Sequence, residues 1–149
     1  MIYIFICLVI FNIIAIFMPK RLKKIEIYAT CFFAFNFGRI TDDLLDVKLN
    51  LYGFVSEGLQ YLGFLAQLLI YPSISTLFLN FFPFDKSVAA KSYYILGWSL
   101  FSICFEWISL QTNFFYYTTW KLWYSAMLYP IIFYILYANL KLVRRLMKS

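Results

Sequence analysis

Three aspartates in the segment DDLLD, residues 42–46, have the spacing that most directly suggests chemistry in this sequence. A D-D-x-x-D spacing lets prenyl-diphosphate enzymes hold magnesium through carboxylate oxygens, which are the ligands that Mg²⁺ prefers. Such an enzyme needs a second acidic cluster, and only Glu57 and Glu106 are available here. We therefore predict no metal site and no enzyme. The segment is then an acidic outer cap that binds cations incidentally, or a plain solvated helix end.

Other catalytic equipment is missing from the sequence as well. There is no histidine, which removes the usual general base near neutral pH and the commonest metal ligand. No P-loop, glycine-rich dinucleotide loop or G-x-S-x-G nucleophile site occurs. The cysteines, Cys7, Cys31 and Cys104, are an odd and scattered set that offers no disulfide or metal framework. We expect no cofactor.

The composition predicts a membrane protein. Hydrophobic residues make up 64% of the 149 residues and charged residues 13%, whereas soluble domains are about 45–50% apolar and about 25% charged. A span needs roughly 20 apolar helical residues, and helices are expected because unpaired backbone groups cannot face lipid. The predicted spans are residues 2–18, 25–41, 58–82, 92–113 and 121–140. We expect an all-α fold, with residues 1–149 forming a single transmembrane domain of five helices.

The net charge of +6 is explained by membrane topology and does not require a nucleic-acid partner. Lysine and arginine close to span ends are retained on the cytoplasmic side. With the N-terminus outside, ten cations lie inside: Lys20, Arg21, Lys23, Lys24, Lys86, Lys91, Lys141, Arg144, Arg145 and Lys148. Only Arg39, Lys48 and Lys121 lie outside. The sequence therefore predicts the N-terminus outside and the C-terminus inside.

Polar side chains recur at helical spacing within two of the predicted spans. In the fourth span, the stripe is Ser99, Ser102, Glu106, Ser109 and Asn113, at spacings of 3, 4, 3 and 4 residues. The third span begins with Ser56, Gln60, Gly63 and Gln67 and continues through Ser73, Thr76 and Asn80. Such stripes cannot face acyl chains, and polar contacts between membrane helices typically contribute about 0.6 kcal/mol each. We expect the serines and glutamines to join helices inside the bundle.

Glu106 differs from the other members of its stripe because it is ionisable. An ionisable residue at the centre of a span costs roughly 2.5–3.5 kcal/mol on insertion scales and is a functional candidate by default. Its depth, toward the outer end of its helix, matches the depth expected of Arg39. We predict an Arg39–Glu106 ion pair. The alternative is that Glu106 is unpaired and binds a proton or a cation.

The third and fifth predicted spans share a tyrosine–proline pair. Tyr71 precedes Pro72 and Tyr129 precedes Pro130, and each proline should kink its helix. This recurrence has two interpretations, a parallel repeat of helices two–three and four–five or a coincidence, and we favour coincidence. The aromatic side chains of the outer turn, Tyr116, Tyr117, Trp120, Trp123 and Tyr124, are expected at the headgroup level.

Four segments of the sequence are similar to those of a known family. They are LNLYGF (49–54), YPSISTLFLNFFPF (71–84), YILGWSLFSICFEW (94–107) and FFYYTTWKLWYSAMLYP (114–130). They resemble a family of small uncharacterised multi-span membrane proteins of endospore-forming Bacillus and Clostridium relatives. The resemblance implies a Gram-positive cell membrane or spore inner membrane and no mechanism. It directs attention to Glu106, Trp107, Lys121, Trp123 and Tyr124.

We expect a polar seam between the third and fourth spans that opens toward the outer face. Its mouth would be lined by Arg39, Asp42, Asp43, Asp46, Glu57, Glu106, Gln111, Asn113 and Lys121. The candidate ligand- or ion-binding residues are Glu106, Arg39, Asp42, Asp43, Asp46, Ser102, Ser109, Asn113, Gln60, Gln67 and Lys121.

The predicted function is that of a non-enzymatic membrane subunit that binds a lipid, a small ligand or a partner protein in this seam. One alternative is an oligomeric proton or cation transporter or channel that uses Glu106. A further alternative is an intramembrane enzyme that modifies lipid. Expected partners are membrane lipids and either a partner membrane protein or further copies of the chain.

Overall fold

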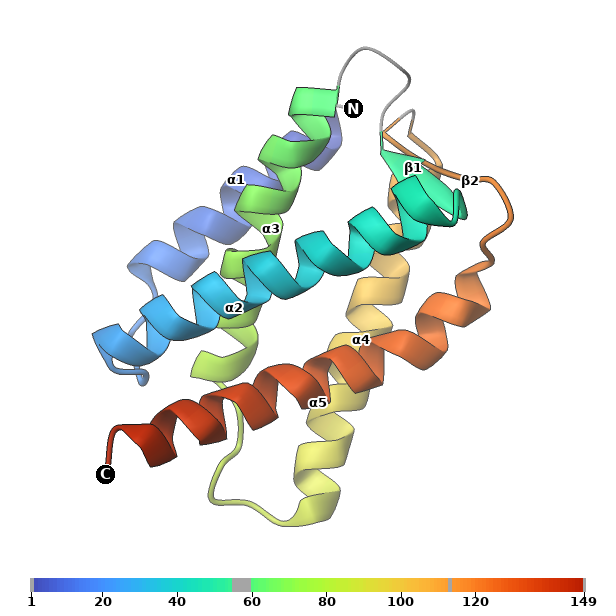
Figure 1. Cartoon of the computed structure of the whole chain (residues 1–149). Coiled ribbons are helices and arrows are strands. Elements are labelled where there is room, and N and C mark those ends of the chain that lie inside the picture. The colour runs from blue at the N-terminus through green and yellow to red at the C-terminus, as the bar shows by residue number, and fades with distance from the viewer. Residues whose placement is uncertain (1, 55–59, 113, 149) are drawn as a thin grey trace.

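The computed structural model describes residues 2–54, 60–112 and 114–148. These residues form five α-helices: α1 (Ile2–Phe17), α2 (Lys24–Asp42), α3 (Gln60–Asn80), α4 (Val88–Leu110) and α5 (Leu122–Leu146) (Figure 1). A π-helical turn, Asp43–Lys48, continues α2. Two short strands, β1 (Tyr52–Phe54) and β2 (Phe115–Tyr117), pair as an antiparallel ribbon. The chain is mostly helical, and the ribbon is an addition to the all-α prediction.

Three of the helices in the described residues are long and apolar enough to cross a membrane, namely α3, α4 and α5. Helix α1 is apolar but has only 16 residues. Helix α2 has 19 residues but carries Lys24, Glu26, Arg39 and Asp42. The predicted third and fourth spans also include residues 58, 59 and 113, which lie outside the described part of the chain. Five crossings therefore remain a prediction.

The two ends of the bundle differ in what they carry (Figure 1). The N-terminus lies at the end where β1 and β2 are found. The C-terminus lies at the opposite end, together with the connection between α3 and α4. An odd number of crossings places the two termini on opposite sides of a membrane, so this arrangement is compatible with the predicted topology.

Helix α3 packs against its neighbours through aromatic rings near its C-terminal end. Phe78 is fully buried. The centroid of its ring lies 4.7 Å from that of Phe133 of α5 and 5.5 Å from that of Tyr94 of α4. The hydroxyl of Tyr94 donates to the Phe78 carbonyl at 2.9 Å. Ser87 caps α4, because its hydroxyl oxygen accepts from the backbone N–H of Ala90 at 3.3 Å. This aromatic core holds α3, α4 and α5 together.

Asparagine side chains attach α1 to α3. The amide of Asn12 donates to the Leu69 carbonyl at 3.1 Å. Leu69 lies about one turn before Pro72, which interrupts the backbone hydrogen bonding of α3. At the other end of α3, the amide of Asn80 donates to the Pro19 carbonyl at 2.9 Å and accepts from the backbone N–H of Arg21 at 2.8 Å. These bonds satisfy backbone groups at both ends of the α1–α3 contact.

Helices α2 and α5 are joined by a charged pair at the end opposite the ribbon. Glu26 is only 3% exposed, and its Oε1 lies 2.7 Å from Nε of Arg144. The other oxygen accepts from the backbone N–H of Lys23 at 2.8 Å, so both carboxylate oxygens are bonded. The Arg144 guanidinium also lies over the ring of Phe84, 4.1 Å from its centroid. This pair was not predicted from the sequence.

The ribbon places two tyrosines beside each other. Tyr52 of β1 is the register partner of Tyr117 of β2. The carbonyl of Leu51 accepts from the backbone N–H groups of Thr118, Thr119 and Trp120 at 2.9, 3.0 and 2.9 Å. The segment that leads into α5 is therefore held against the start of β1.

Candidate functional site

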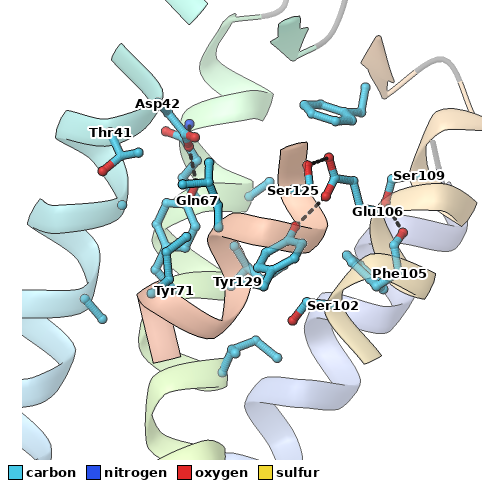
Figure 2. Close-up of a pocket in the computed structure, with 18 of the residues that line it drawn as sticks. Thr41, Asp42, Gln67, Tyr71, Ser102, Phe105, Glu106, Ser109, Ser125 and Tyr129 are labelled. Carbon is cyan, nitrogen blue, oxygen red and sulfur yellow. Dashed lines mark hydrogen bonds between the residues drawn. The ribbon is translucent and has the colours of Figure 1, made fainter. Parts of the chain in front are cut away.

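A cavity of about 250 Å³ lies inside the bundle. Residues from all five helices and from both strands line it, and most are apolar or aromatic. Of the described residues that line it, only Asp42 and Glu106 carry an ionisable carboxylate, and none is a lysine or an arginine. Figure 2 shows Asp42 on α2 and Glu106 on α4 at opposite sides of this space. The cavity is thus an apolar space with two acidic groups in its wall.

Asp42 lies within a cluster of three hydrogen-bond donors, which we call the Asp42 cluster. Its Oδ1 accepts from the hydroxyl of Tyr52 at 2.7 Å. Its Oδ2 accepts from the amide of Gln67 at 2.8 Å and from the hydroxyl of Tyr71. The donors come from β1 and α3, so the carboxylate at the end of α2 joins three elements.

Glu106 lies within a second cluster of three donors, the Glu106 cluster. Its Oε1 accepts from the hydroxyl of Tyr117 at 2.5 Å. Oε1 also accepts from Ser125 at 2.7 Å, and Oε2 accepts from Tyr129 at 2.7 Å (Figure 2). The indole N–H of Trp120 donates to Oγ of Ser125 at 2.8 Å, which orients that hydroxyl toward Glu106. This cluster contains no cation among the described residues.

The two clusters have matching architecture. In each, a carboxylate near the C-terminal end of one helix accepts from a tyrosine of the following strand and from two residues of the next helix. Those two residues are four positions apart, Gln67 and Tyr71 in α3 and Ser125 and Tyr129 in α5, and both tyrosines precede a proline. The two strand tyrosines are partners in the ribbon. This correspondence favours the repeat of helices two–three and four–five over the coincidence that we had preferred.

The strand tyrosines are kept protonated by their surroundings. Burial and then the negative charge of Asp42 raise the pKa of Tyr52, and the charge of Glu106 adds a smaller contribution. Burial and the hydrogen bond to Glu106 likewise raise the pKa of Tyr117. Both hydroxyls therefore act as donors at neutral pH. The two clusters are joined through the ribbon, because Tyr52 and Tyr117 are register partners.

Burial also affects the acids at the end of α2. It raises the pKa of Asp42, which follows the predicted span 25–41, to about 6, although hydrogen bonds from Tyr52, Tyr71 and Gln67 oppose the shift. Burial, and then the charge of Asp43, raise the pKa of Asp46.

The predicted Arg39–Glu106 ion pair is wrong. Nη1 of Arg39 donates to Oε1 of Gln67 at 2.7 Å, and Nη2 lies 2.9 Å from Oδ1 of Asp43. Glu106 instead faces the hydroxyls of its own cluster. Matching depth along two helices was not enough to identify neighbours, because Arg39 turns toward α3 whereas Glu106 turns toward α5.

The three aspartates of DDLLD do not converge. Asp42 points into the cavity, Asp43 pairs with Arg39, and Asp46 lies in the π-helical turn. The described residues contain no group of three or more histidine, cysteine, aspartate or glutamate side chains arranged to hold a metal ion. The three acids therefore lie in different environments, and their spacing does not bring them together at one site.

The expected polar mouth is also not assembled as predicted. Nine residues were expected to line this mouth. Among those of the nine that the structure describes, Asp42 and Glu106 line the cavity. The side chains of Gln111 and Lys121 are exposed, with Lys121 at the start of α5. Glu57 and Asn113 lie outside the described residues, and for Gln60 only its position as the first residue of α3 is described.

The described members of the two polar stripes do not pair with each other in a seam between α3 and α4. Gln67 of α3 bonds to Asp42 of α2, and Glu106 of α4 bonds to residues of α5. Ser109 is buried and donates to the Phe105 carbonyl at 2.8 Å, whereas Ser102 lies in the cavity wall (Figure 2). Gln67 of α3 and Ser102, Glu106 and Ser109 of α4 line the cavity, whereas Ser73, Thr76, Asn80 and Ser99 of the same stripes do not.

The sequence did not identify five of the six donors to the two carboxylates, Tyr52, Tyr71, Tyr117, Ser125 and Tyr129, nor Trp120, which donates to Ser125. Tyr117 and Trp120 were expected at the headgroup level. Instead, Tyr117 donates to Glu106 and Trp120 donates to Ser125. Their neighbours Tyr116 and Trp123 are exposed, as a headgroup position requires. The one signal for the donors inside the helices was the repeated tyrosine–proline pair.

Comparison with known proteins leaves the fold and the site to be interpreted from the structure itself. No protein-family model, no curated protein and no solved structure matches the chain. The similarity to membrane proteins of spore-forming bacteria therefore stays a prediction.

Proposed function

We propose that the protein is a non-enzymatic integral membrane protein that binds a small ligand in the cavity between the Asp42 and Glu106 clusters. The observation that carries this proposal is an internal apolar cavity with two hydrogen-bonded carboxylates in its wall and no lysine or arginine among its described lining residues. Apolar pockets with a few oriented polar groups are the usual form of small-molecule sites. The proposed location is the cell membrane.

The outer surface of the bundle supports a membrane location. Large apolar side chains are exposed on α1, α3, α4 and α5, including Phe17, Leu68, Leu100 and Ile131. Polar groups such as Thr30, Gln67, Ser99 and Glu106 are buried instead. Contiguous apolar surface of this kind is unfavourable in water and favourable in lipid.

We further propose five crossings, with the N-terminus outside and the C-terminus inside. The distribution of lysine and arginine and the position of the termini at opposite ends support this topology. A maleimide that does not cross membranes, applied to intact cells with the native cysteines replaced, should label Tyr116→Cys and leave Lys86→Cys unlabelled. The reverse pattern would contradict the topology.

The size of the cavity favours a small molecule among the three expected kinds of occupant. A cavity of about 150 Å³ with apolar walls holds benzene, so the observed space of about 250 Å³ fits a molecule of roughly ten non-hydrogen atoms. A complete lipid or a helix of a partner protein is much larger. Membrane lipids then surround the outer surface of the bundle and do not occupy the cavity.

Native mass spectrometry of the gently extracted protein tests this proposal. We expect a monomer that retains one small companion molecule, and we expect Ala66→Phe to lose it. Ala66 is 3% exposed and lines the cavity, so a larger side chain at this position occupies the space of the ligand. Leu65→Phe is the matched control, because Leu65 is 42% exposed and does not line the cavity. Equal ligand content in both variants would contradict the proposal.

The rival function is transport of a proton or cation by an oligomer. Matching halves around a central site are common in transporters, where parallel repeats rock against each other, and the two clusters have this relationship. The same mass spectra distinguish the two functions. A defined homo-oligomer without a companion would favour transport and would direct attention to cation flux in Glu106→Gln.

A further inference from the structure

The charge balance of the cavity wall indicates the kind of ligand. Asp42 is partly compensated, because Gln67 accepts a hydrogen bond from Arg39 and donates one to the carboxylate. Arg39 itself is paired with Asp43. Glu106 is bonded only by neutral hydroxyls among the described residues. The wall therefore holds two carboxyl groups and, among its described residues, no lysine or arginine beside them.

The wall also has unused acceptor positions. An ionised carboxylate has about four acceptor positions, and each of these two accepts three hydrogen bonds from the described residues. From those residues, Oδ1 of Asp42 and Oε2 of Glu106 each accept a single bond. Ser75, which also lines the cavity, is 1% exposed, and its Oγ has no hydrogen-bond partner among the described residues. A buried hydroxyl without a partner is unfavourable unless a ligand or a water bonds to it.

The remaining wall is suited to an apolar body and to a positive charge. Phe37, Phe101, Phe105, Phe133 and the rings of Tyr71 and Tyr129 all line the cavity. Aromatic faces attract cations through their quadrupole, more strongly when water is excluded. An ammonium group has three donors and no acceptor, which matches a wall that offers unused acceptors.

We propose that the ligand of this cavity is a small organic cation, in which an apolar body of roughly ten non-hydrogen atoms carries one protonated amine. This inference rests on the proposed function and names the chemical class of its ligand. The amine bonds to Asp42 or Glu106, and the apolar body packs on the aromatic wall.

Three probes of nearly equal size and different charge test the proposal on the purified protein in a nonionic detergent. They are 2-phenylethylamine, 2-phenylethanol and 3-phenylpropanoate. Affinity is obtained from the ligand-induced rise in Tm, followed by tryptophan fluorescence. We expect the amine to bind at least about tenfold more tightly than the alcohol, because charge-assisted hydrogen bonds are about twice as strong as neutral ones. The carboxylate should not bind.

The outcomes separate this inference from the proposed function. Equal binding of amine and alcohol would overturn the cationic ligand and leave a cavity for a small neutral molecule. Tighter binding of the carboxylate would also overturn it. No rise in Tm with any probe, together with equal ligand content in Ala66→Phe and Leu65→Phe, would overturn the proposed function as well.

Two substitutions locate the source of the selectivity. Glu106→Gln and Asp42→Asn keep the size of each side chain and remove its charge. We expect each to reduce the amine-to-alcohol affinity ratio severalfold. Asp85→Asn removes the same charge from an exposed position in the loop between α3 and α4 and should leave the ratio unchanged. An equal fall of the ratio in all three variants would show that selectivity arises from net charge rather than from the cavity.

Discussion

Arg144→Met is expected to lower the free energy of unfolding by about 3 kcal/mol, the low end of the cost of breaking a buried ion pair. Arg144 is the charged partner of Glu26, whose side chain is only 4% accessible, whereas the side chain of Arg144 is 33% accessible. Removing the guanidinium leaves a carboxylate buried between α2 and α5 with one backbone hydrogen bond. Denaturant unfolding in mixed micelles, compared with the unchanged protein, measures the loss.

Two further variants distinguish the buried charge from general effects at this end of α5. Arg145→Met removes the adjacent cation, which is exposed, and should change the stability by less than about 0.5 kcal/mol. The double variant Glu26→Gln and Arg144→Met removes both charges and should recover most of the loss. A double variant no more stable than Arg144→Met alone would show that the cost comes from lost packing against Phe84.

Gly38→Ala is expected to lower the free energy of unfolding by about 1–3 kcal/mol, the usual cost of overpacking. A Cβ at this position would lie 2.7 Å from Cδ2 and Cε2 of Tyr71. The ring must then shift, and its hydroxyl is one of the three donors to Asp42. Unfolding in mixed micelles measures the stability, and the amine-to-alcohol affinity ratio should fall with it.

Gly97→Ala is the matched control because it is the same substitution inside another helix. No atom lies within 4 Å of a Cβ placed at Gly97, which is exposed on α4. An alanine there should raise the stability by about 0.5–1 kcal/mol, since glycine has the greater conformational freedom in the unfolded chain. Effects of the same sign and size at both positions would contradict the close packing of α2 on Tyr71.

Much of the helical architecture could be predicted from hydropathy, because long apolar runs with few charges have few alternatives to helix in lipid. The end of α2 and the ribbon were not predicted. Each strand has three residues, too few to show an alternating pattern, and the segments NLYGF and NFFYYTT also fit an interfacial loop. The π-helical turn depends on contacts made after the chain has folded.

The site was predicted only in part, because the sequence identifies Glu106 and does not identify its hydrogen-bond partners. Burying a carboxylate in a span is unfavourable enough to identify Glu106 from sequence. The partners of Glu106 could not be identified, because tyrosine is suited both to the headgroup level and to a buried hydrogen bond. The separate environments of Asp42 and Asp43 depend on the direction in which each side chain leaves the helix. The repeated tyrosine–proline pair is the sequence feature that marks two of the donors, Tyr71 and Tyr129.

The most direct test of the ligand site is an anomalous difference map from crystals grown with 2-(4-bromophenyl)ethylamine. Bromine scatters anomalously, so the map locates the ring without interpretation of weak density. The structure predicts one strong peak inside the cavity, near Phe101 and Phe133, with the amine toward Asp42 or Glu106. Peaks confined to the lipid-facing surface, with an unoccupied cavity, would contradict the account.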